Sequence, residues 1–553
     1  MASHGFRWAT WIVVATTAAG VAALGACGSS GGGIGDGGGD AFSSDGPWNN
    51  VDGGDGSPAG DSGGCPPYEI SCNGTCVSAT SANNCGACGA TCPSNQFCTA
   101  GGCVATCPPG LTGCAGVCVD VQIDNGNCGV CGKACPANQG CVDGQCVPAW
   151  TPSTNPVCNG GGPPIVVNDG DAGTCTSQIA QTSFTWGVCS CVDAKLTAEV
   201  LIDGWNSTQG PYKPGIMGGG LGVDHAVTSS SKDDIWGPMW AAATSGSAVL
   251  MSSQSTVHHD MQSGANVTAD LAVLKDAYVA GDIVGPVAVT QTLYQPATST
   301  RTNVTYGKLV NQPVTVAPPC DCTKKIPVGA YVAAAKTTND NASIGLDPGI
   351  LAQANPPARI DLPCGSYYLT GFSLAGSSAI VVHGKTAIFI DGNVDTSGFL
   401  ELGIDTTMAS ELDVFVSGTV TSSSQFKFGS PNAPALARLY IGGTQPFTMS
   451  SGIVVAGEIW VGNAPVDWTA QTDMFGAIFA GDFTSTAKLN LHHDQGVEQV
   501  GSPCGPPDGG GCGSCKDCGN QACINGTCGQ CTSSAQCCPP LLCQNGTCVP
   551  PVN

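Results

Sequence analysis

Two copies of one eight-cysteine pattern constrain the fold more than any other feature of this sequence. The gaps between the cysteines agree apart from one residue inserted before Cys128, so the period is about 42 residues. Modules this small cannot bury a sufficient core and need covalent bridges. The first copy consists of Cys65, Cys72, Cys76, Cys85, Cys88, Cys92, Cys98 and Cys103, and the second of Cys107, Cys114, Cys118, Cys128, Cys131, Cys135, Cys141 and Cys146.

The repeated Cys-x-x-Cys pairs suit either zinc or disulfides. No histidine lies between residues 65 and 148, and each copy has eight cysteines rather than four. We therefore predict disulfides and no metal, and an oxidising compartment. Eight cysteines allow 105 connectivities, so the pairing stays open. The segments NNCGACGATC and GNCGVCGKAC resemble the cysteine-rich repeats of myxobacterial lipoproteins and secreted proteins.

The beginning of the chain has the pattern of an export signal. An apolar run at 11–23 is too short to span a bilayer comfortably, and no later segment is long enough to do so. The following Leu24-Gly25-Ala26-Cys27 resembles the bacterial lipobox. The resemblance implies that residues 1–26 are removed and that Cys27 carries a diacylglycerol. It implies a cell-envelope lipoprotein of the outer membrane, periplasmic or surface-exposed. The alternative is an ordinary signal peptide.

Residues 27–64 are rich in glycine and aspartate and predict a solvated, disordered tether. The sequence GDSGG at 60–64 matches the serine motif of chymotrypsin-like proteases, but only the tether and the leader precede it, so we interpret it as a coincidence. The whole chain of 553 residues has a formal net charge of −23. Such an acidic protein would repel nucleic acid, which excludes DNA or RNA as the main partner.

The remaining chain divides by composition. After the repeats at 65–106 and 107–148, a Pro/Gly-rich linker covers 149–175. Period-2 patterns such as ELDVFVSGTV predict strands throughout 176–503, whereas VGAYVAAAKTT is the best helix candidate. The tail at 504–553 is again cysteine-rich and has a knottin-like C-x5-CC-x4-C-x4-C core.

One phrase recurs through the strand-rich region as YVAGDI, FIDGNV, FVSGTV, VVAGEI and IFAGDF. It suits a strand that bends at the glycine and then resumes. Recurrence at irregular intervals predicts a mainly β fold with a β-solenoid flanked by small disulfide-rich modules. A β-sandwich is the alternative.

This region resembles the right-handed parallel β-helices of bactofilin-like polymer-forming proteins. From Cys320 to about Val500 it also resembles an uncharacterised domain of pilus-accessory and myxobacterial surface proteins. The segments TTNDNASIGL (337–346) and TAKLNLHHD (486–494) carry that likeness. The resemblance implies a fold and an envelope location rather than a chemistry.

The numbers of cysteines in the middle region and the tail suggest further bridges. Seven cysteines in the middle and eleven in the tail are both odd numbers, which is consistent with one bridge between the two regions, for which Cys364 and Cys504 are candidates. Residues two apart on a strand face the same way. The two structural Cys-x-Cys pairs could therefore lie side by side on neighbouring strands and form two disulfides, which would close a loop of about 130 residues. A redox-active pair is the alternative. The pairs are Cys189 with Cys191 and Cys320 with Cys322.

Enzymes with a solenoid fold use carboxylates and basic residues lined up on one face. The candidates here are Asp391, Asp413, Asp473 and Asp482, although aspartate beside a glycine is also an ordinary turn residue. The sequence His-His-Asp occurs at 258–260 and at 492–494. If the two segments met, they could form a metal site. Otherwise they are polar strand ends.

The sequence therefore predicts a lipid-anchored, non-enzymatic envelope protein with a structural, adhesive or binding role and no cofactor. Its expected partners are the membrane, through the lipid, and a surface glycan or an envelope or pilus protein. The alternatives are a carbohydrate-active enzyme on the same scaffold and a periplasmic accessory of pilus-type assembly. Convergence of three or more of the candidate carboxylates and histidines in one groove would favour the enzyme. A plain face of Thr, Ser, Asn and aromatic residues would favour binding.

Overall fold

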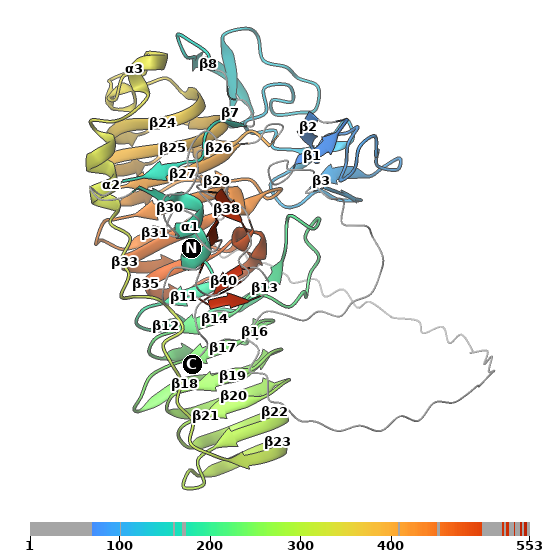
Figure 1. Cartoon of the computed structure of the whole chain (residues 1–553), viewed down its shortest axis with the longest axis vertical. Helices are drawn as coiled ribbons and strands as arrows, with labels where there is room; N and C mark the ends of the chain where they lie inside the picture. Colours follow the sequence, from blue (N-terminus) through green and yellow to red (C-terminus); the bar gives the residue numbers. More distant parts are fainter. Residues whose placement is uncertain are drawn as a thin grey trace, which may run out of the picture. The chain divides into compact units, whose positions relative to one another are not determined.

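The computed structural model (Figure 1) describes most of the chain from residue 69 to residue 499. The predictions for the leader, Cys27, the tether and GDSGG lie outside the described residues, as does most of the tail. Gly60–Asn553 forms one compact unit. The described residues are 69–73, 75–99, 101–156, 158, 161–168, 173–406, 410–450, 454–499, 533 and 536, and the short strands β37 (Ala522–Ile524), β38 (Thr527–Gly529), β39 (Leu542–Gln544) and β40 (Thr547–Val549).

The centre of the protein is a parallel β-solenoid made of two segments. The lower segment contains β11 (Val188–Ser190), β12 (Ala194–Leu196), β13 (Val200–Trp205), β14 (Leu221–Val223), β15 (Val227–Ser229), β16 (Asp234–Ile235), β17 (Met239–Ala241), β18 (Ser247–Val257), β19 (Met261–Ser263), β20 (Asn266–Val273), β21 (Ala277–Val279), β22 (Ile283–Gln295) and β23 (Arg301–Asn311). The upper segment contains β24 (Arg359–Leu374), β25 (Ser378–Thr396), β26 (Leu400–Ile404), β27 (Glu411–Val416), β28 (Val420–Ser422), β29 (Phe426–Gly429), β30 (Ala437–Ile441), β31 (Phe447–Met449), β32 (Val455–Ala456), β33 (Glu458–Trp468), β34 (Thr472–Phe475), β35 (Ile478–Ser485) and β36 (Leu489–Asp494).

Successive rungs pair in parallel through both segments, which confirms the mainly β, solenoid-like fold. A sandwich would require antiparallel sheets instead. Along each strand, apolar side chains point inward at every second position, as at Leu412, Val414 and Val416 of β27. Three of the recurrent glycines, Gly281, Gly418 and Gly457, lie between strands, whereas Gly392 and Gly481 lie inside β25 and β35. A Cβ atom on Gly418, between β27 and β28, would lie only 2.6 Å from the carbonyl oxygen of Gly392 in the rung above.

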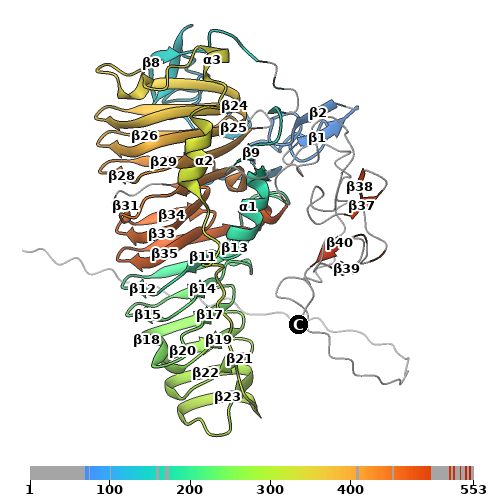
Figure 2. The ribbon, with the colours of Figure 1, turned by 60° about the vertical axis from the view of Figure 1, so that its left-hand side comes forward.

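The stack order differs from the chain order. The last strands of the upper segment, β35 and β36, pair in parallel with the first strands of the lower segment. Ile478 is opposite Val188, and Leu491 is opposite Ile202. We call this junction the splice. The chain therefore enters the stack in the middle, winds down to β23, returns to the top and winds down again to β36 (Figure 2).

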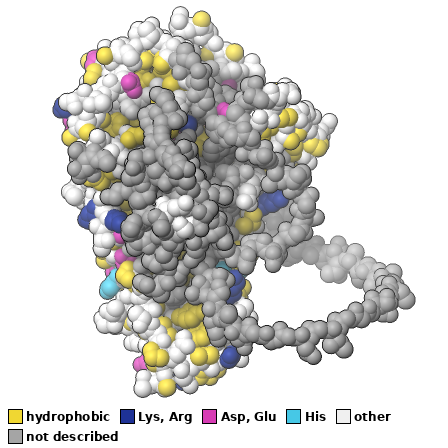
Figure 3. Space-filling view, in the orientation of Figure 1, with side chains coloured by type: hydrophobic (Ala, Val, Ile, Leu, Met, Phe, Trp, Pro, Cys, Tyr) yellow, Lys and Arg dark blue, Asp and Glu magenta, His cyan; other side chains and the backbone are white. Residues whose placement is uncertain are grey.

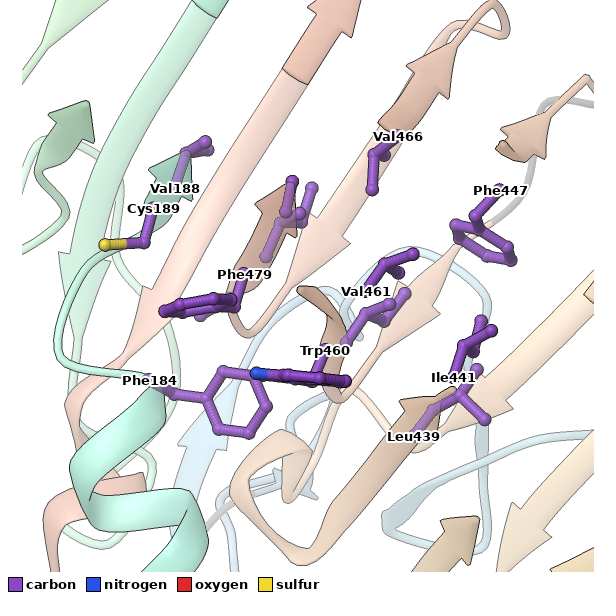
Figure 4. Packing of buried hydrophobic residues seen from close by; sticks show 14 of the residues in the cluster. Phe184, Val188, Cys189, Leu439, Ile441, Phe447, Trp460, Val461, Val466 and Phe479 are labelled. Carbon is purple, nitrogen blue, oxygen red and sulfur yellow. The ribbon is translucent and has the colours of Figure 1, made fainter. Parts of the chain in front are cut away.

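Outward-facing aromatic rings of the upper segment are covered by two helices, α1 (Thr176–Ser183) and α2 (Val328–Ala335). Phe415 stacks on Tyr440 at 4.7 Å, and Tyr331 of α2 packs edge-on against Phe415. Phe184, at the end of α1, contacts Tyr440 and lies near Trp460 in Figure 4. The predicted helix at VGAYVAAAKTT is thus present as α2. The short helices α3 (Asn341–Ile344), η2 (Ile350–Ala352), η3 (Pro434–Leu436) and η4 (Gln495–Glu498) complete the domain.

The two cysteine repeats are hairpin modules with one shared connectivity. In the second repeat the first cysteine bonds to the third, the second to the fifth, the fourth to the seventh and the sixth to the eighth. The described bridges of the first repeat follow the same scheme. Their strands are β1 (Glu69–Cys72), β2 (Thr75–Ser78), β3 (Phe97–Thr99), β4 (Gly102–Val104), β5 (Thr112–Cys114), β6 (Val117–Val119), β7 (Gln139–Val142) and β8 (Gln145–Trp150), and the linker adds β9 (Val166–Val167) and β10 (Thr174–Cys175).

Cysteines of the middle region connect distant parts of the chain. Cys189 bonds to Cys320, and Cys191 bonds to Cys322. These two disulfides confirm the predicted pairing of the two Cys-x-Cys segments, which we call the Cys-x-Cys ladder. The suggested bridge from Cys364 to the tail is wrong, because Cys364 bonds to Cys158. Strand β8 pairs with β24, which places the linker after the second repeat beside the top rung. Cys175 is also disulfide-bonded.

Candidate binding cleft

A polar interface joins the second cysteine repeat to the upper segment. Arg359, at the start of β24, is 2% exposed, and its Nη1 atom donates to the carbonyl oxygens of Ile123 and Cys141 at 2.6 and 2.7 Å. The Lys427 ammonium donates to Asp120 at 2.7 Å. The Asn432 amide donates to the carbonyl oxygen of Cys118. The repeat is therefore held by charged and polar contacts together with a small apolar cluster of Ile123, Val142, Ala379, Val381 and Phe399.

Two cavities lie along this interface. One, of about 240 Å³, is lined from both sides, by Asp120 and Asp124 of the repeat and by His383 and Asp405 of the solenoid. The other, of about 750 Å³, is lined by the 151–156 segment of the linker together with Asp361 and His383. Both cavities include Asn125 and His383. We call the two together the cleft.

His383 lies between two carboxylates in the cleft. Its Nε2 atom is 2.9 Å from Asp361, and its Nδ1 atom is 2.9 Å from Asp405. Asp361 also accepts hydrogen bonds from the Nε and Nη2 atoms of Arg359. The four side chains form a row of alternating charge, which runs from Arg359 through Asp361 and His383 to Asp405.

The electrostatics favour the ionised forms of His383 and Asp361. Burial alone would lower the pKa of His383, but the hydrogen bonds from its ring to Asp361 and Asp405 outweigh burial and raise the pKa to about 9. Burial would raise the pKa of Asp361, but its bonds to His383 and Arg359 lower it. At neutral pH both ring nitrogens of His383 are therefore protonated and donate to carboxylates, so the ring has no lone pair with which to act as a base.

A second acidic group lies beneath the interface. Glu401 of β26 is 1% exposed. Its burial and the nearby Asp120 carboxylate raise its pKa well above the ordinary value, although Lys427 opposes this shift. Burial thus disfavours the ionised form of Glu401, whose carboxylate lies 4.0 Å from the Lys427 ammonium, beside the Lys427–Asp120 ion pair.

The four carboxylates that the sequence singled out are each engaged in a separate structural contact. Asp413 is fully buried and binds Arg438 through two hydrogen bonds, at 2.7 and 2.9 Å. Asp391 accepts from Lys336 and Tyr368. Asp482 accepts from the backbone of Asp193, and Asp473 from Asn490. The groups that do converge, Asp361, His383 and Asp405, were missed. The spacing Arg359-x-Asp361 on one strand face was the available signal.

The two His-His-Asp segments do not meet. β36 stacks on β13, β13 on β16 and β16 on β18, so three strand spacings, about 14 Å, separate them. The hypothesis of a joint metal site is therefore wrong. His258 instead binds Asp234 at 2.7 Å and stacks on Trp236. His492 and Asp494 bind residues of the lower segment across the splice, Asp203 and Ser207.

Two clusters of three cysteines have sulfur atoms close enough for a metal ion, namely Cys85, Cys92 and Cys103, and Cys128, Cys135 and Cys146. All six sulfurs are in disulfides. A disulfide sulfur is not a thiolate and is not a ligand of the kind that zinc prefers. These clusters therefore fit the disulfide prediction and not the zinc alternative.

Residues 318–500 match the family model of a domain of unknown function, DUF7305. The match begins just before the Cys320/Cys322 pair and covers α2 and the whole upper segment. No curated protein matches the chain. No solved structure matches it either. The lower segment, onto which the matched region stacks, lies outside the match.

Proposed function

We propose that this protein is a lipid-anchored cell-envelope protein of the outer membrane that binds a polar partner in its cleft and has no enzymatic activity. The observation that carries the proposal is the state of His383. Its two ring nitrogens both donate to carboxylates at neutral pH. A general base needs a free lone pair and a pKa near the working pH. A row of fixed, alternating charges suits recognition of a polar ligand instead.

The location rests on the disulfides, on the lipobox-like segment and on the likeness to cysteine-rich lipoproteins. Ten disulfides among the described residues indicate an oxidising, extracytoplasmic compartment. Within the part of the chain that the structure describes, no helix is both long and apolar enough to cross a membrane. The lipobox-like Leu24-Gly25-Ala26-Cys27 supports anchoring through a lipid on Cys27. The likeness to cysteine-rich myxobacterial lipoproteins supports the same assignment.

The test is the intact mass of the protein extracted from membranes, with free thiols alkylated before any reduction. We expect a chain that begins at Cys27, carries the added mass of a diacylglycerol and has no alkylated cysteine. A Cys27→Ser variant should lack the lipid and leave the membrane fraction. A chain without lipid would contradict anchoring, and several alkylated cysteines would contradict the stapled fold.

The binding role is tested separately. Asp405→Asn and His383→Gln should each weaken capture of envelope material by the purified protein, whereas Asp321→Asn, on an exposed turn, should not. Turnover of any envelope polysaccharide that is lost in His383→Gln would contradict the non-enzymatic assignment.

A further inference from the structure

One side of the solenoid carries paired hydroxyl groups at successive rungs. In the upper segment three rungs present two hydroxyls each, two residues apart: Thr421 and Ser423, Thr448 and Ser450, Thr484 and Thr486. The side chains of the intervening residues, Met449 and Ser485, are buried in the core. The hydroxyls therefore point outward in two columns, whereas the alternate positions point inward.

The columns continue across the splice into the lower segment. Thr484 of β35 is opposite Lys195 of β12, and Lys195 is opposite Thr228 of β15. The lower rungs add Thr197, Thr228, Ser230, Ser252 and Thr268 to the same side. Thus β28, β31, β33, β35, β12, β15, β18 and β20 contribute in stack order, and they lie one below another along one margin of Figure 2. We call this surface the hydroxyl face.

The two columns differ in their hydrogen bonds. The second-column hydroxyls donate to the carbonyl oxygen of the neighbouring rung, as Ser450 does to Ser422 at 2.8 Å and Thr469 to Met449 at 2.9 Å. Their lone pairs are left as acceptors in a fixed orientation. Within the described residues, the first-column hydroxyls of Thr421, Thr448 and Thr484 have no protein partner, so each can donate and accept.

The hydroxyl face is nearly neutral on a strongly acidic protein. The chain has a net charge of −23, but at the eight rungs the two columns contain only Asp467, Asp270 and Lys195 as charged residues, with Leu250 as the other interruption. The helices α1 and α2 cover a different side of the stack, and the second cysteine repeat lies against a third (Figures 1 and 2). Figure 3 shows that much of the described surface is uncharged.

We propose that the hydroxyl face binds an extended, uncharged polysaccharide that lies along the stack axis. Neighbouring rungs are about 4.8 Å apart, a distance comparable to the advance of one sugar unit along an extended chain. The rungs of β28, β31 and β35 each offer an ordered acceptor and an unpartnered hydroxyl, which complement the hydroxyl groups of a neutral glycan. Such a ligand brings no charge into an acidic surface, whereas an anionic polymer would be repelled.

The proposal is tested with the full mature protein and a panel of neutral polysaccharides, namely cellulose, chitin and a soluble β-glucan. The face variant is Thr228→Val/Thr448→Val/Thr484→Val, which removes three hydroxyls while keeping the branched shape of the strand residues. The matched control, Thr256→Val/Thr290→Val/Thr305→Val, removes three threonine hydroxyls outside the hydroxyl face, on β18, β22 and β23. Melting temperatures of both variants serve to confirm folding.

We expect retention on at least one of these polysaccharides, at least 10-fold weaker binding by the face variant, and binding by the control within about 2-fold of the parent. The proposal is overturned if no polysaccharide on the panel retains the parent protein, or if both triple variants lose binding equally. Shaping of ice crystals without polysaccharide retention would also overturn it and assign the array to ordered water. The anchoring experiment does not depend on any of these outcomes.

Discussion

The Nδ1 atom of His492 lies 2.7 Å from an Oδ1 atom of Asp203, although 289 residues of chain separate the two. This contact closes the splice. Asp203 is fully buried and also accepts from the Tyr212 hydroxyl at 2.7 Å and from the backbone N–H of Gly215 at 3.1 Å. One carboxylate therefore organises the first rung of the lower segment and joins it to the last rung of the upper one.

Asp203→Ala should destabilise the protein by about 2–4 kcal/mol, because three donors lose a buried acceptor. Chemical denaturation measures this loss. Asp321→Asn is the control, since Asp321 pairs with Lys324 on the surface, and it should change stability by less than about 1 kcal/mol. Equal effects of the two substitutions would show that the splice does not depend on Asp203.

The two disulfides of the Cys-x-Cys ladder should be redundant. Each closes a loop with a sequence separation of 131 residues. One such closure is worth about 5 kcal/mol in chain entropy, and a second at almost the same position adds little. Replacing Cys191 and Cys322 with serine should therefore cost far less than replacing all four cysteines. Denaturation of both variants under oxidising conditions distinguishes this expectation from additive losses.

The row of charges in the cleft predicts a loss of stability at alkaline pH. The pKa of His383 in the folded protein, about 9, lies above the unfolded value of about 6.5. Its contribution to stability is therefore complete below pH 6.5 and disappears as the pH rises through 9. The parent protein should lose stability relative to His383→Gln over this interval. A pH-independent difference between the two would contradict the protonated state of His383, which an NMR titration measures directly.

The same row of charges also predicts a loss of stability at acidic pH. The pKa of Asp361 is lowered in the folded protein, so its contribution is present above the unfolded pKa and is lost as the pH falls through the folded value. Asp361→Asn should therefore reduce the dependence of stability on pH below about 4. Asp270→Asn, outside the cleft, should leave that dependence unchanged.

Asp413 should behave as a structural residue. Asp413→Ala leaves the Arg438 guanidinium buried, with the nearby Glu411 as its remaining carboxylate partner, and should cost about 3–5 kcal/mol. Combining it with Arg438→Met should recover much of that loss, which a double-mutant cycle measures. A stable Asp413→Ala variant that has lost an activity would instead support the carboxylate as a catalytic group.

Sequence patterns predicted the local features of the fold. The inward–outward alternation and the recurrent phrase with a central glycine predicted a solenoid. The two-residue period of a strand predicted the Cys-x-Cys ladder. Both patterns depend only on residues that are close in the sequence. Cys364 shows the limit of such reasoning. An even total of cysteines does not identify partners, and the bond to Cys158 follows from the pairing of β8 with β24, which no sequence period encodes.

The residues of the cleft could not be predicted from the sequence for a similar reason. Arg359, His383 and Asp405 lie on different rungs, and only the stacking of β24, β25 and the end of β26 brings them together. The hydroxyl face is also a property of the stack. Thr484 and Thr228 belong to segments whose order is reversed between the sequence and the solenoid, so their alignment depends on the splice.

The splice also sets an order of assembly. Residues 188–205 are made long before residues 478–494, which cover them. Until those residues arrive, the first rung of the lower segment has an unpaired strand edge, the kind of surface that invites pairing with another chain. Two unfinished copies could each complete the other's rung, which would exchange identical elements between them. Pairing of β35 and β36 with β11, β12 and β13 within one chain leaves no such edge at the splice.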